Sequence, residues 1–340
     1  MSAEVIPLRP ERPEKQPSLD PILKLTANAM NAVNSVILDR MQSEIPLIPA
    51  LAGHLISGGG KRLRPMLTLA GAELVGYQGE RHHKLAAAVE FIHTATLLHD
   101  DVVDGSDLRR GKAAANIIFG NPATVLVGDF LFSRSFELMV EDGSLKVLKI
   151  LSHASAVIAE GEVDQLTAQR QIATSEERYL DIIGAKTAAL FAAASRISAV
   201  VAECSESEEQ ALDDYGRNLG VAFQLVDDAM DYDTDAVDMG KAKGDDFREG
   251  KMTLPVIFAY ARGDEEERSF WRDAMQGHKS SDEDLLRAVE LIRKYDAHTA
   301  TRDRAEHFAQ RAIDALTIFP ASKAREAMVE AAQFSVSRGY

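Results

Sequence analysis

The spacing of proline is the feature of this 340-residue sequence that most restricts its fold. Proline breaks helices because it lacks a backbone N–H and its ring clashes with the preceding turn. Pro122 is the one proline between Pro65 and Pro255, and this long stretch is rich in Ala, Leu, Val and Glu. No alternating apolar and polar runs bounded by turn residues are evident, so we expect no β-sheet. The sequence therefore predicts an all-α protein built as a single large helical bundle.

Hydrophobic periodicity and helix-breaking residues together predict where the helices lie. The expected ranges are 22–43, 46–56, 62–76, 81–104, 121–140, 144–171, 175–203, 206–232, 252–263, 266–276, 281–295, 298–316 and 320–337. Gly58 to Gly60 should form a hinge, and the glycine- and charge-rich stretch 238–251 should form a loop. Five of the eleven prolines lie within residues 1–21, which predicts a flexible Pro-rich arm before a helical domain at 22–340. The last 80 residues could form a looser lobe.

The overall charge and the single cysteine narrow the possible classes of function. The formal net charge of −15 argues against a nucleic-acid-binding protein, because phosphate recognition needs a basic face; solubility alone could also explain the acidity. Cys204 has no second cysteine for a disulfide, which fits a reducing compartment. The sequence contains no run of the ~18 apolar residues that are needed to span a bilayer. Its N-terminus also lacks the apolar stretch of a secretory signal. We therefore expect a cytoplasmic protein without a transmembrane segment.

A first acidic motif, Asp100-Asp101-Val102-Val103-Asp104, lies near the end of a predicted helix. Residues four apart share one helix face, so Asp100 and Asp104 should project together while Asp101 flanks them. Like charges at this spacing destabilise a helix unless a cation lies between them. A hard divalent cation with oxygen ligands is the natural candidate.

A second acidic motif lies on a later predicted helix. Its polar residues are Gln224, Asp227, Asp228 and Asp231, at the i, i+3, i+4, i+7 spacing of one helical face. Such a face either meets water or lines a metal-bearing cavity. Two solvated acidic faces are therefore the plain alternative to two metal sites.

Glycine-flanked basic clusters accompany the acidic motifs. The first is Gly59-Gly60-Lys61-Arg62-Leu63-Arg64-Pro65, the second is Leu108-Arg109-Arg110-Gly111-Lys112, and the third runs from Gly240 to Lys251. Arg offers a bidentate fork for phosphate, and Lys a mobile point charge. No strand precedes the glycines, so they match neither a P-loop nor a dinucleotide-binding fingerprint. The combination of acidic and basic motifs suits a polyanionic, metal-bridged substrate.

Several separated motifs carry a resemblance to a known family. They are GGGKRLRP, EFIHTATLLHDDVVDGSDLRRGK, GDFLFSRSF, GEVDQL, GAKTAALF, FQLVDDAMDY and GDDFREGKMTLP. Over about residues 22–335 the sequence resembles the trans-isoprenyl diphosphate synthases, in particular the bacterial long-chain group that makes octaprenyl and decaprenyl diphosphates. The resemblance implies an all-α fold around a deep central cavity, a homodimer, and Mg²⁺ as the cofactor.

The resemblance also implies roles for individual residues. Mg²⁺ ligands would be Asp100, Asp101, Asp104, Asp227, Asp228 and Asp231, and all of these except Asp231 would be catalytic together with Lys186. Isopentenyl diphosphate would be bound by Lys61, Arg64, His93 and Arg110. The allylic diphosphate would be bound by Arg109, Lys186, Thr187, Gln224, Lys241 and Lys251. We expect His99 to serve local packing, and Arg62 and Lys112 to be surface charges.

The implied reaction is Mg²⁺-dependent, head-to-tail condensation of isopentenyl diphosphate with an allylic diphosphate such as farnesyl diphosphate. The allylic C–O bond ionises, the isopentenyl double bond attacks the cation, and proton loss gives a trans double bond. The expected product has eight to ten isoprene units (about C40–C50), typical of quinone side chains. A shorter-chain synthase or a non-catalytic helical partner subunit is the alternative. A terpene cyclase would lack the cluster at 61–64, and a squalene-type synthase spaces its aspartates differently.

Product length should depend on the wall beside the first acidic motif. Ala95 and Thr96 lie five and four residues before Asp100, and both are small, whereas short-chain relatives typically carry aromatic residues at this level. Phe132 and Phe136 share a helix face and could form a deeper floor. The sequence also departs from the family pattern at Gly105 and at Ala113-Ala114, none of which is an expected ligand.

Overall fold

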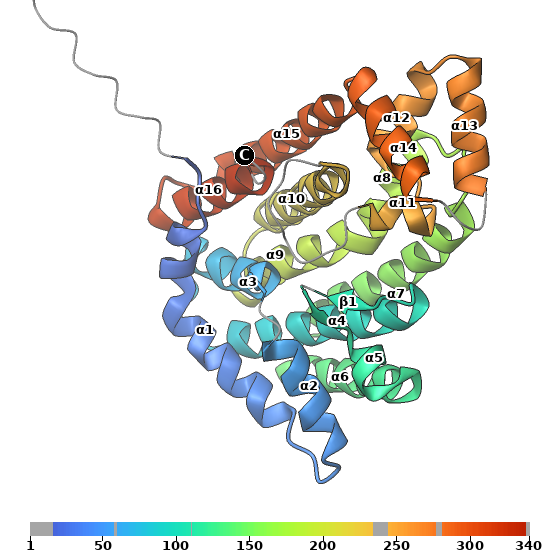
Figure 1. Ribbon diagram of the computed structural model, residues 1–340. Helices are drawn as coiled ribbons and strands as arrows, with labels where there is room; N and C mark the ends of the chain where they lie inside the picture. Colours follow the sequence, from blue (N-terminus) through green and yellow to red (C-terminus); the bar gives the residue numbers. More distant parts are fainter. Residues whose placement is uncertain (1–15, 58–59, 110, 234–243, 277–280, 338–340) are drawn as a thin grey trace, which may run out of the picture.

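The structure is a computed structural model that describes residues 16–57, 60–109, 111–233, 244–276 and 281–337, without the side chains of 52 and 55–57. Helices dominate it, as predicted (Figure 1). The helices are α1 Asp20–Arg40, α2 Leu47–Ser57, α3 Leu63–Leu74, α4 Arg81–Val103, α5 Ala115–Phe119, α6 Asn121–Asp142, α7 Leu145–Ala168, α8 Glu176–Ile183, α9 Ala189–Val201, α10 Glu206–Asp231, α11 Asp245–Glu249, α12 Leu254–Arg262, α13 Glu265–Gln276, α14 Asp282–Lys294, α15 Ala297–Ala315 and α16 Lys323–Ser337. A π-turn, Gly184–Ala188, joins α8 to α9, and a 3₁₀ turn, Leu316–Ile318, follows α15.

Short elements correct the sequence-based prediction in three places. β1 (Leu108–Arg109) and β2 (Lys112–Ala113) pair antiparallel where no sheet was expected. With two residues each, these strands are too short to show an alternating pattern. Helix α5 was not predicted, and α11 lies within the expected loop 238–251. Gly244 and Gly250, which favoured a loop, instead flank α11 with left-handed φ angles of 77° and 74°.

The predicted N-terminal arm and glycine hinge lie partly outside the described residues. Residues 1–15 and 58–59 are not described. The end of the expected arm is packed: Leu19 is buried, and the Ser18 backbone N–H donates to Glu330 Oε1 at 3.2 Å. Helix α1 already begins at Asp20. The helical domain therefore starts earlier than residue 22.

Helix α10 lies at the centre of the bundle and packs along α9 and α15 (Figure 1). Ser205 starts it with a capping box, in which its side chain accepts from the Glu208 N–H and the Glu208 side chain accepts from the Ser205 N–H. Close contact with α9 requires a glycine, because a Cβ on Gly216 would lie 2.3 Å from the backbone oxygen of Phe191. Two helix backbones can approach this closely only where a side chain is missing.

Helix α4 forms the facing part of the bundle and packs against α3, α6 and α9. In Figure 1, α1 and α2 lie at one end of the molecule, and α12, α13 and α14 gather at the other. The last 80 residues belong to the same bundle, because α15 packs on α10, α16 packs on α3, and Trp271 is fully buried. The expected looser lobe is therefore wrong, and the single bundle is confirmed.

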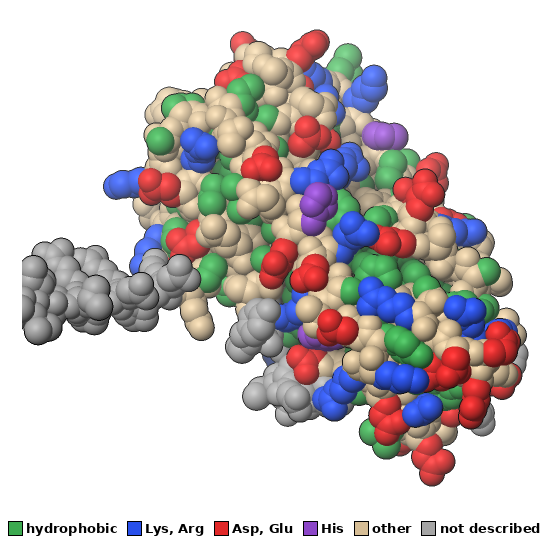
Figure 2. All heavy atoms as spheres, turned by 90° about the horizontal axis from the view of Figure 1, so that it is seen from above, with side chains coloured by type: hydrophobic (Ala, Val, Ile, Leu, Met, Phe, Trp, Pro, Cys, Tyr) green, Lys and Arg blue, Asp and Glu red, His purple; other side chains and the backbone are tan. Residues whose placement is uncertain are grey.

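One helical segment in the described part of the chain, Glu176–Val201, is long and apolar enough to cross a membrane by length and composition alone. Of its most apolar window, 78% is buried inside the protein. Burial of this kind is what a core helix of a globular bundle shows. On the face seen in Figure 2, acidic and basic side chains are interspersed, and no continuous basic surface is visible there.

Candidate active site

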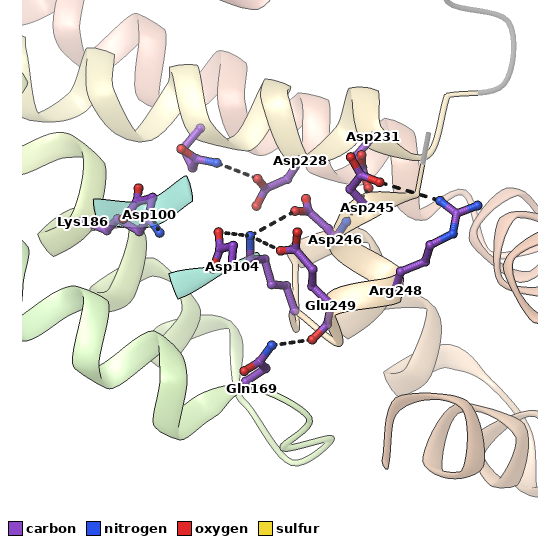
Figure 3. Close-up of polar contacts among 12 residues, drawn as sticks. Asp100, Asp104, Gln169, Lys186, Asp228, Asp231, Asp245, Asp246, Arg248 and Glu249 are labelled. Carbon is purple, nitrogen blue, oxygen red and sulfur yellow. Dashed lines mark hydrogen bonds and ion pairs between the residues drawn. The ribbon is translucent and has the colours of Figure 1, made fainter. Parts of the chain in front are cut away.

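The C-terminal end of α4 places Asp100 and Asp104 close to Lys186 of the π-turn (Figure 3). A second lysine, Lys251, reaches Asp104 from the segment that follows α11. Lys186 Nζ lies 3.8 Å from Asp100 Oδ2, and Lys251 Nζ lies 3.3 Å from Asp104 Oδ2. Burial raises the pKa of Asp100, and the Asp104 charge adds to this effect while Lys186 opposes it. Asp100 and Asp104 thus lie on one face of α4, as their four-residue spacing predicted. Their two negative charges lie close enough together that a nearby cation would stabilise them.

Asp101 has different surroundings from its two neighbours in the motif. Its side chain is fully buried, and Arg109 Nε in β1 donates to Asp101 Oδ1. The Asp101 backbone oxygen accepts a bond from Asn116 Nδ2 at 3.0 Å. These contacts link the end of α4 to the β1–β2 hairpin and to α5. Metal ligation by Asp101 stays a prediction, and its observed partner is Arg109.

A chain of hydrogen bonds runs through the second acidic motif on α10. Thr187 Oγ1 donates to Gln224 Oε1 at 2.9 Å, and Gln224 Nε2 donates to Asp228 Oδ1 at 2.7 Å. The Tyr179 hydroxyl of α8 donates to Asp228 Oδ2 at 2.5 Å. Burial raises the pKa of Asp228 to about 7, the Asp246 charge adds to this, and the two hydrogen bonds oppose it. Both oxygens of Asp228 thus have protein donors.

The other two aspartates of this motif are only half-buried. These are Asp227 and Asp231. Asp231 Oδ2 accepts a bond from the Asp246 backbone N–H at 3.1 Å, which joins the end of α10 to the start of α11. The predicted stripe on one face of α10 is therefore partly engaged with α8 and α11.

The π-turn between α8 and α9 carries both Lys186 and Thr187. π-turns inside helices often occur at functional sites. Lys186 Nζ donates to Glu162 Oε2 of α7 at 2.7 Å. Burial raises the pKa of Glu162 to about 7, the Asp100 charge adds to this, and Lys186 opposes it. Helix α7 comes this close because a Cβ on Gly161 would lie 2.9 Å from the Lys186 backbone nitrogen.

Lys251 connects the α11 segment to α4. Its Nζ lies 3.3 Å from Asp104 and 3.8 Å from Asp246, and it forms an ion pair with Glu249. Figure 3 labels these three carboxylates. Burial disfavours the charge on Lys251, but Asp246, Asp104 and Glu249 together outweigh burial and raise its pKa. Lys251 is thus a protonated cation among three carboxylates.

The basic residues expected to bind isopentenyl diphosphate lie at the start of α3 and on α4. Arg64 Nη1 lies 3.0 Å from His93 Nε2, and the Arg64 guanidinium lies 4.4 Å from the centre of the Phe191 ring. Lys61 Nζ lies 4.9 Å from the centre of the Phe334 ring. The structure thus brings Arg64 and His93 together from separate helices. Arg110 and Lys241, also expected to bind substrate, lie outside the described residues.

Two minor expectations have mixed outcomes. Arg62 was expected to be a surface charge, but its side chain donates to Asn34 and lies 3.8 Å from Glu90. It adopts a left-handed φ of 44° just before α3 and helps to fix the entry to that helix. His99 Nε2 lies 3.3 Å from Asp129 Oδ1 on α6, and its role in local packing stays a prediction.

The candidate chain-length wall lies where α4 packs against α6. Ala95 is buried, and Thr96 Oγ1 donates to the His93 backbone oxygen at 2.8 Å. Phe132 and Phe136 stack edge-to-face with their ring centres 5.1 Å apart, and both pack against the core cluster that contains Ala95. Ala95, Phe132 and Phe136 thus belong to one packed region, Thr96 follows Ala95 on α4, and control of product length by these residues stays a prediction.

The donor set fits Mg²⁺ that arrives with a diphosphate. Among the described residues, no three His, Cys, Asp or Glu side chains lie close enough to hold a metal ion by themselves. Mg²⁺ usually takes one or two carboxylates, with substrate phosphate oxygens and water completing its shell. Asp100 and Asp104 at the end of α4, and Asp227 and Asp231 on α10, offer such carboxylates from two helices.

Some residues of the site were missed by sequence reasoning. Glu162 lies in the GEVDQL motif, and Asp246 and Glu249 lie in the GDDFREGKMTLP motif, but no role followed from their spacing. Tyr179 precedes Lys186 by seven residues, and nothing local indicates that its hydroxyl meets Asp228. These contacts join residues distant in sequence, so only the tertiary packing reveals them.

Comparisons with known proteins show which family the chain belongs to. The chain is 48% identical over 322 residues to the octaprenyl diphosphate synthase of Escherichia coli (strain K12), covering 94% of this chain and 99% of the relative. A crystal structure of a polyprenyl synthase from Caulobacter crescentus CB15, complexed with calcium and isoprenyl diphosphate, is 55% identical with a TM-score of 0.92, covering 96% of this chain and 100% of that one. A decaprenyl diphosphate synthase structure from Rhodobacter capsulatus is 50% identical with a TM-score of 0.91, covering 95% and 100%. Residues 45–292 match the polyprenyl synthetase family, and the chain belongs to this family.

Proposed function

We propose that this protein is a long-chain trans-polyprenyl diphosphate synthase, a prenyltransferase that adds isopentenyl units to an allylic diphosphate. The observation that carries the proposal is the pairing of Asp100 with Lys186 and of Asp104 with Lys251. Carboxylates that can hold a divalent cation and lysines that can hold phosphate oxygens meet in one place, as a metal-bridged diphosphate requires. The similarity to an octaprenyl and a decaprenyl diphosphate synthase supports a product of about C40–C50.

The two substrates would occupy two basic regions. Isopentenyl diphosphate would lie near Lys61, Arg64 and His93, where arginine offers its planar fork to phosphate oxygens. The allylic diphosphate would lie near Lys186 and Lys251, with Arg109, Thr187 and Gln224 beside it. Arg110 and Lys241 would complete these two sets.

Mg²⁺ bound by the aspartates would supply Lewis-acid and electrostatic stabilisation of the departing diphosphate. Lys186 and Lys251 would exchange their carboxylate partners for phosphate oxygens and would hold the negative charge that develops on the leaving group. Glu162 would orient Lys186, and the Thr187–Gln224 hydrogen bond would fix both side chains. The apolar core below Asp100 would exclude water, which would otherwise trap the allylic cation.

We also propose a homodimer, which exposed apolar side chains on α5 and α6 support. Ile117 and Ile118 of α5 and Val125 and Leu126 of α6 are all exposed, and the two helices pack together. A contiguous apolar surface is typical of a protein interface. Multi-angle light scattering of the wild type and Leu126→Glu measures this: a dimer that the glutamate converts to a monomer is the expected result. We further propose that the protein works in the cytoplasm and that its product supplies the side chains of quinones.

The decisive experiment incubates purified protein with Mg²⁺, farnesyl diphosphate and labelled isopentenyl diphosphate, followed by sizing of the dephosphorylated products. A ladder that ends near eight to ten units is expected. A ladder that stops at three or four units would support the shorter-chain alternative. Absence of elongation with every allylic primer would support the non-catalytic partner subunit.

A further inference from the structure

The C-terminal end of α7 is bonded to the backbone of the α11 segment. Gln169 Nε2 donates to the Glu249 backbone oxygen at 2.5 Å (Figure 3), and the Arg170 backbone N–H donates to the Gly250 oxygen at 2.8 Å. The Arg170 guanidinium also donates to the Met275 oxygen at the end of α13, at 3.1 Å, and to the Arg248 oxygen at 3.5 Å. Two adjacent residues therefore contact several consecutive backbone carbonyls around the end of α11.

These contacts supply what a short helix lacks. The last carbonyls of a helix have no partner within it, and a cation near them is favourable. Helix α11 has five residues, and its closing carbonyls at Arg248 and Glu249 accept from Arg170 and Gln169. The end of α11 is therefore held by α7.

Backbone conformation at both partners fits this contact. Arg170 has a left-handed φ of 63°, which is disfavoured for a residue with a side chain. Gly250 has a φ of 74°, and a Cβ there would lie 2.7 Å from Arg170 Cγ. The Arg170 side chain thus lies directly against the bare backbone of Gly250.

The contact lies one residue from a lysine of the proposed diphosphate site. Lys251 follows Gly250, its backbone N–H donates to the Asp246 oxygen at 2.8 Å, and its Nζ reaches Asp104 at 3.3 Å. Helix α7 also carries Glu162, the partner of Lys186. Glu162 and Gln169 are seven residues apart, about two helical turns. One helix therefore fixes the places of both lysines.

We propose that Gln169 and Arg170 are positioning residues that hold Lys251 beside Asp104 and so determine how tightly the allylic diphosphate binds. We name the contact of Gln169 and Arg170 with Glu249 and Gly250 the α7–α11 clasp. The inference rests on the proposed role of Lys251 in binding the allylic diphosphate. Without the clasp, the backbone that carries Lys251 would lose its hydrogen bonds to the C-terminal end of α7.

The first test replaces Arg170 with alanine and measures kinetics and local backbone protection. We expect the KM for the allylic diphosphate to rise about tenfold, as for other residues that orient binding groups, while the KM for isopentenyl diphosphate stays the same. Hydrogen exchange of 244–253 should become faster, without a similar change in α4. The matched control is Arg178→Ala, which removes an exposed ion pair between α8 and Asp164 of α7 and touches none of the α11 segment. Arg178→Ala should leave the KM values and the exchange of 244–253 unchanged.

A second test uses the close contact between Arg170 and Gly250. Gly250→Ala alone should be strongly damaging, because the new methyl group meets both an unfavourable φ and the Arg170 side chain. In the Arg170→Ala background the methyl group meets no arginine side chain, so the same change should raise the KM by a smaller factor. If the KM of the double variant rises by the product of the two single factors, the two residues act independently and the clasp is overturned.

Arg170→Lys replaces Arg170→Ala if the alanine variant folds poorly. It keeps the aliphatic part of the side chain, so its KM for the allylic diphosphate should lie between those of the wild type and Arg170→Ala.

The outcomes for the clasp and for the proposed function are separable. An Arg170→Ala enzyme with wild-type KM values and wild-type exchange at 244–253 would overturn the clasp while leaving the synthase activity standing. An equal rise in the KM of both substrates would also overturn it, because the clasp positions Lys251 and should therefore affect binding of the allylic diphosphate alone. A wild-type protein without elongation activity would refute the function, and the exchange measurement would still decide whether the clasp holds the α11 segment.

Discussion

Replacing Ala95 with tyrosine tests the path along which the product grows. Ala95 is 1% exposed and lies five residues before Asp100 on α4, so the axial rise between the two Cα atoms is about 7.5 Å. A tyrosine ring there would close the region between α4 and α6 just below the diphosphate. We expect the product to shorten from about eight to ten units to roughly three or four, since the 7.5 Å of helix between the two residues leaves room for few units.

The same change carries a cost in stability that the experiment must separate from the change in length. Adding a ring to a packed core costs about 1–3 kcal/mol of the free energy of unfolding, which urea denaturation measures. Labelled products are dephosphorylated and sized by chromatography, so chain length is read independently of total activity. Ala95→Val is the matched control: it adds bulk without a ring and should keep the long product. A folded, active Ala95→Tyr enzyme with an unchanged ladder would refute the growth path along α4.

Three further predictions concern the site, the core and the surface. Lys186→Ala should lower kcat about 10²–10³-fold in steady-state assays, because it removes a cation placed where leaving-group charge develops; a kcat within a factor of two of wild type would contradict this role. Gly216→Ala should cost about 1–3 kcal/mol in urea denaturation because its Cβ would collide with the backbone of α9, whereas Gly184→Ala, which faces open space, should cost much less. Hydrogen bonds from Lys294 and a neighbouring tyrosine lower the pKa of Glu267 from 4.5 to about 2. Glu267 therefore stabilises the fold above about pH 4.5 and loses this effect as the pH falls toward 2, so Glu267→Gln should destabilise the protein at pH 7 but not near pH 2 in pH-dependent thermal melts.

The helical architecture followed from the sequence because its causes are local. The scarcity of proline between Pro65 and Pro255 and the hydrophobic periodicity act within a few residues, and they located the long helices to within a few positions. Elements of two to five residues were not predicted, because α5, α11 and the strands of the β1–β2 hairpin are too short to show a hydrophobic period. The glycines at 244 and 250 act as helix-flanking residues, a function that depends on the neighbouring helix rather than on composition.

The site was predictable where spacing along one helix decides the geometry. The four-residue spacing placed Asp100 and Asp104 on one face, as the structure shows, but the same spacing could not tell that Asp101 turns to Arg109. Pairs such as Tyr179 with Asp228 depend on how α8 packs on α10. Such contacts arise from packing between elements far apart in the chain, and a single sequence carries no direct signal for them.

The π-turn at Gly184–Ala188 has a consequence for which changes in length this chain can accept. Each residue of an α-helix turns the chain by about 100°, and a π-turn holds one residue more than the regular helix on either side of it. Deleting one residue here would give a continuous α-helix in which α8 and α9 keep nearly the same relative orientation, because the wider π-turn already absorbs the extra residue. The loss would fall on the turn itself, which carries Lys186 and Thr187 and directs them to Glu162 of α7 and Gln224 of α10. A chain shortened by one codon here should therefore keep its helices while losing the placement of a lysine of the proposed diphosphate site.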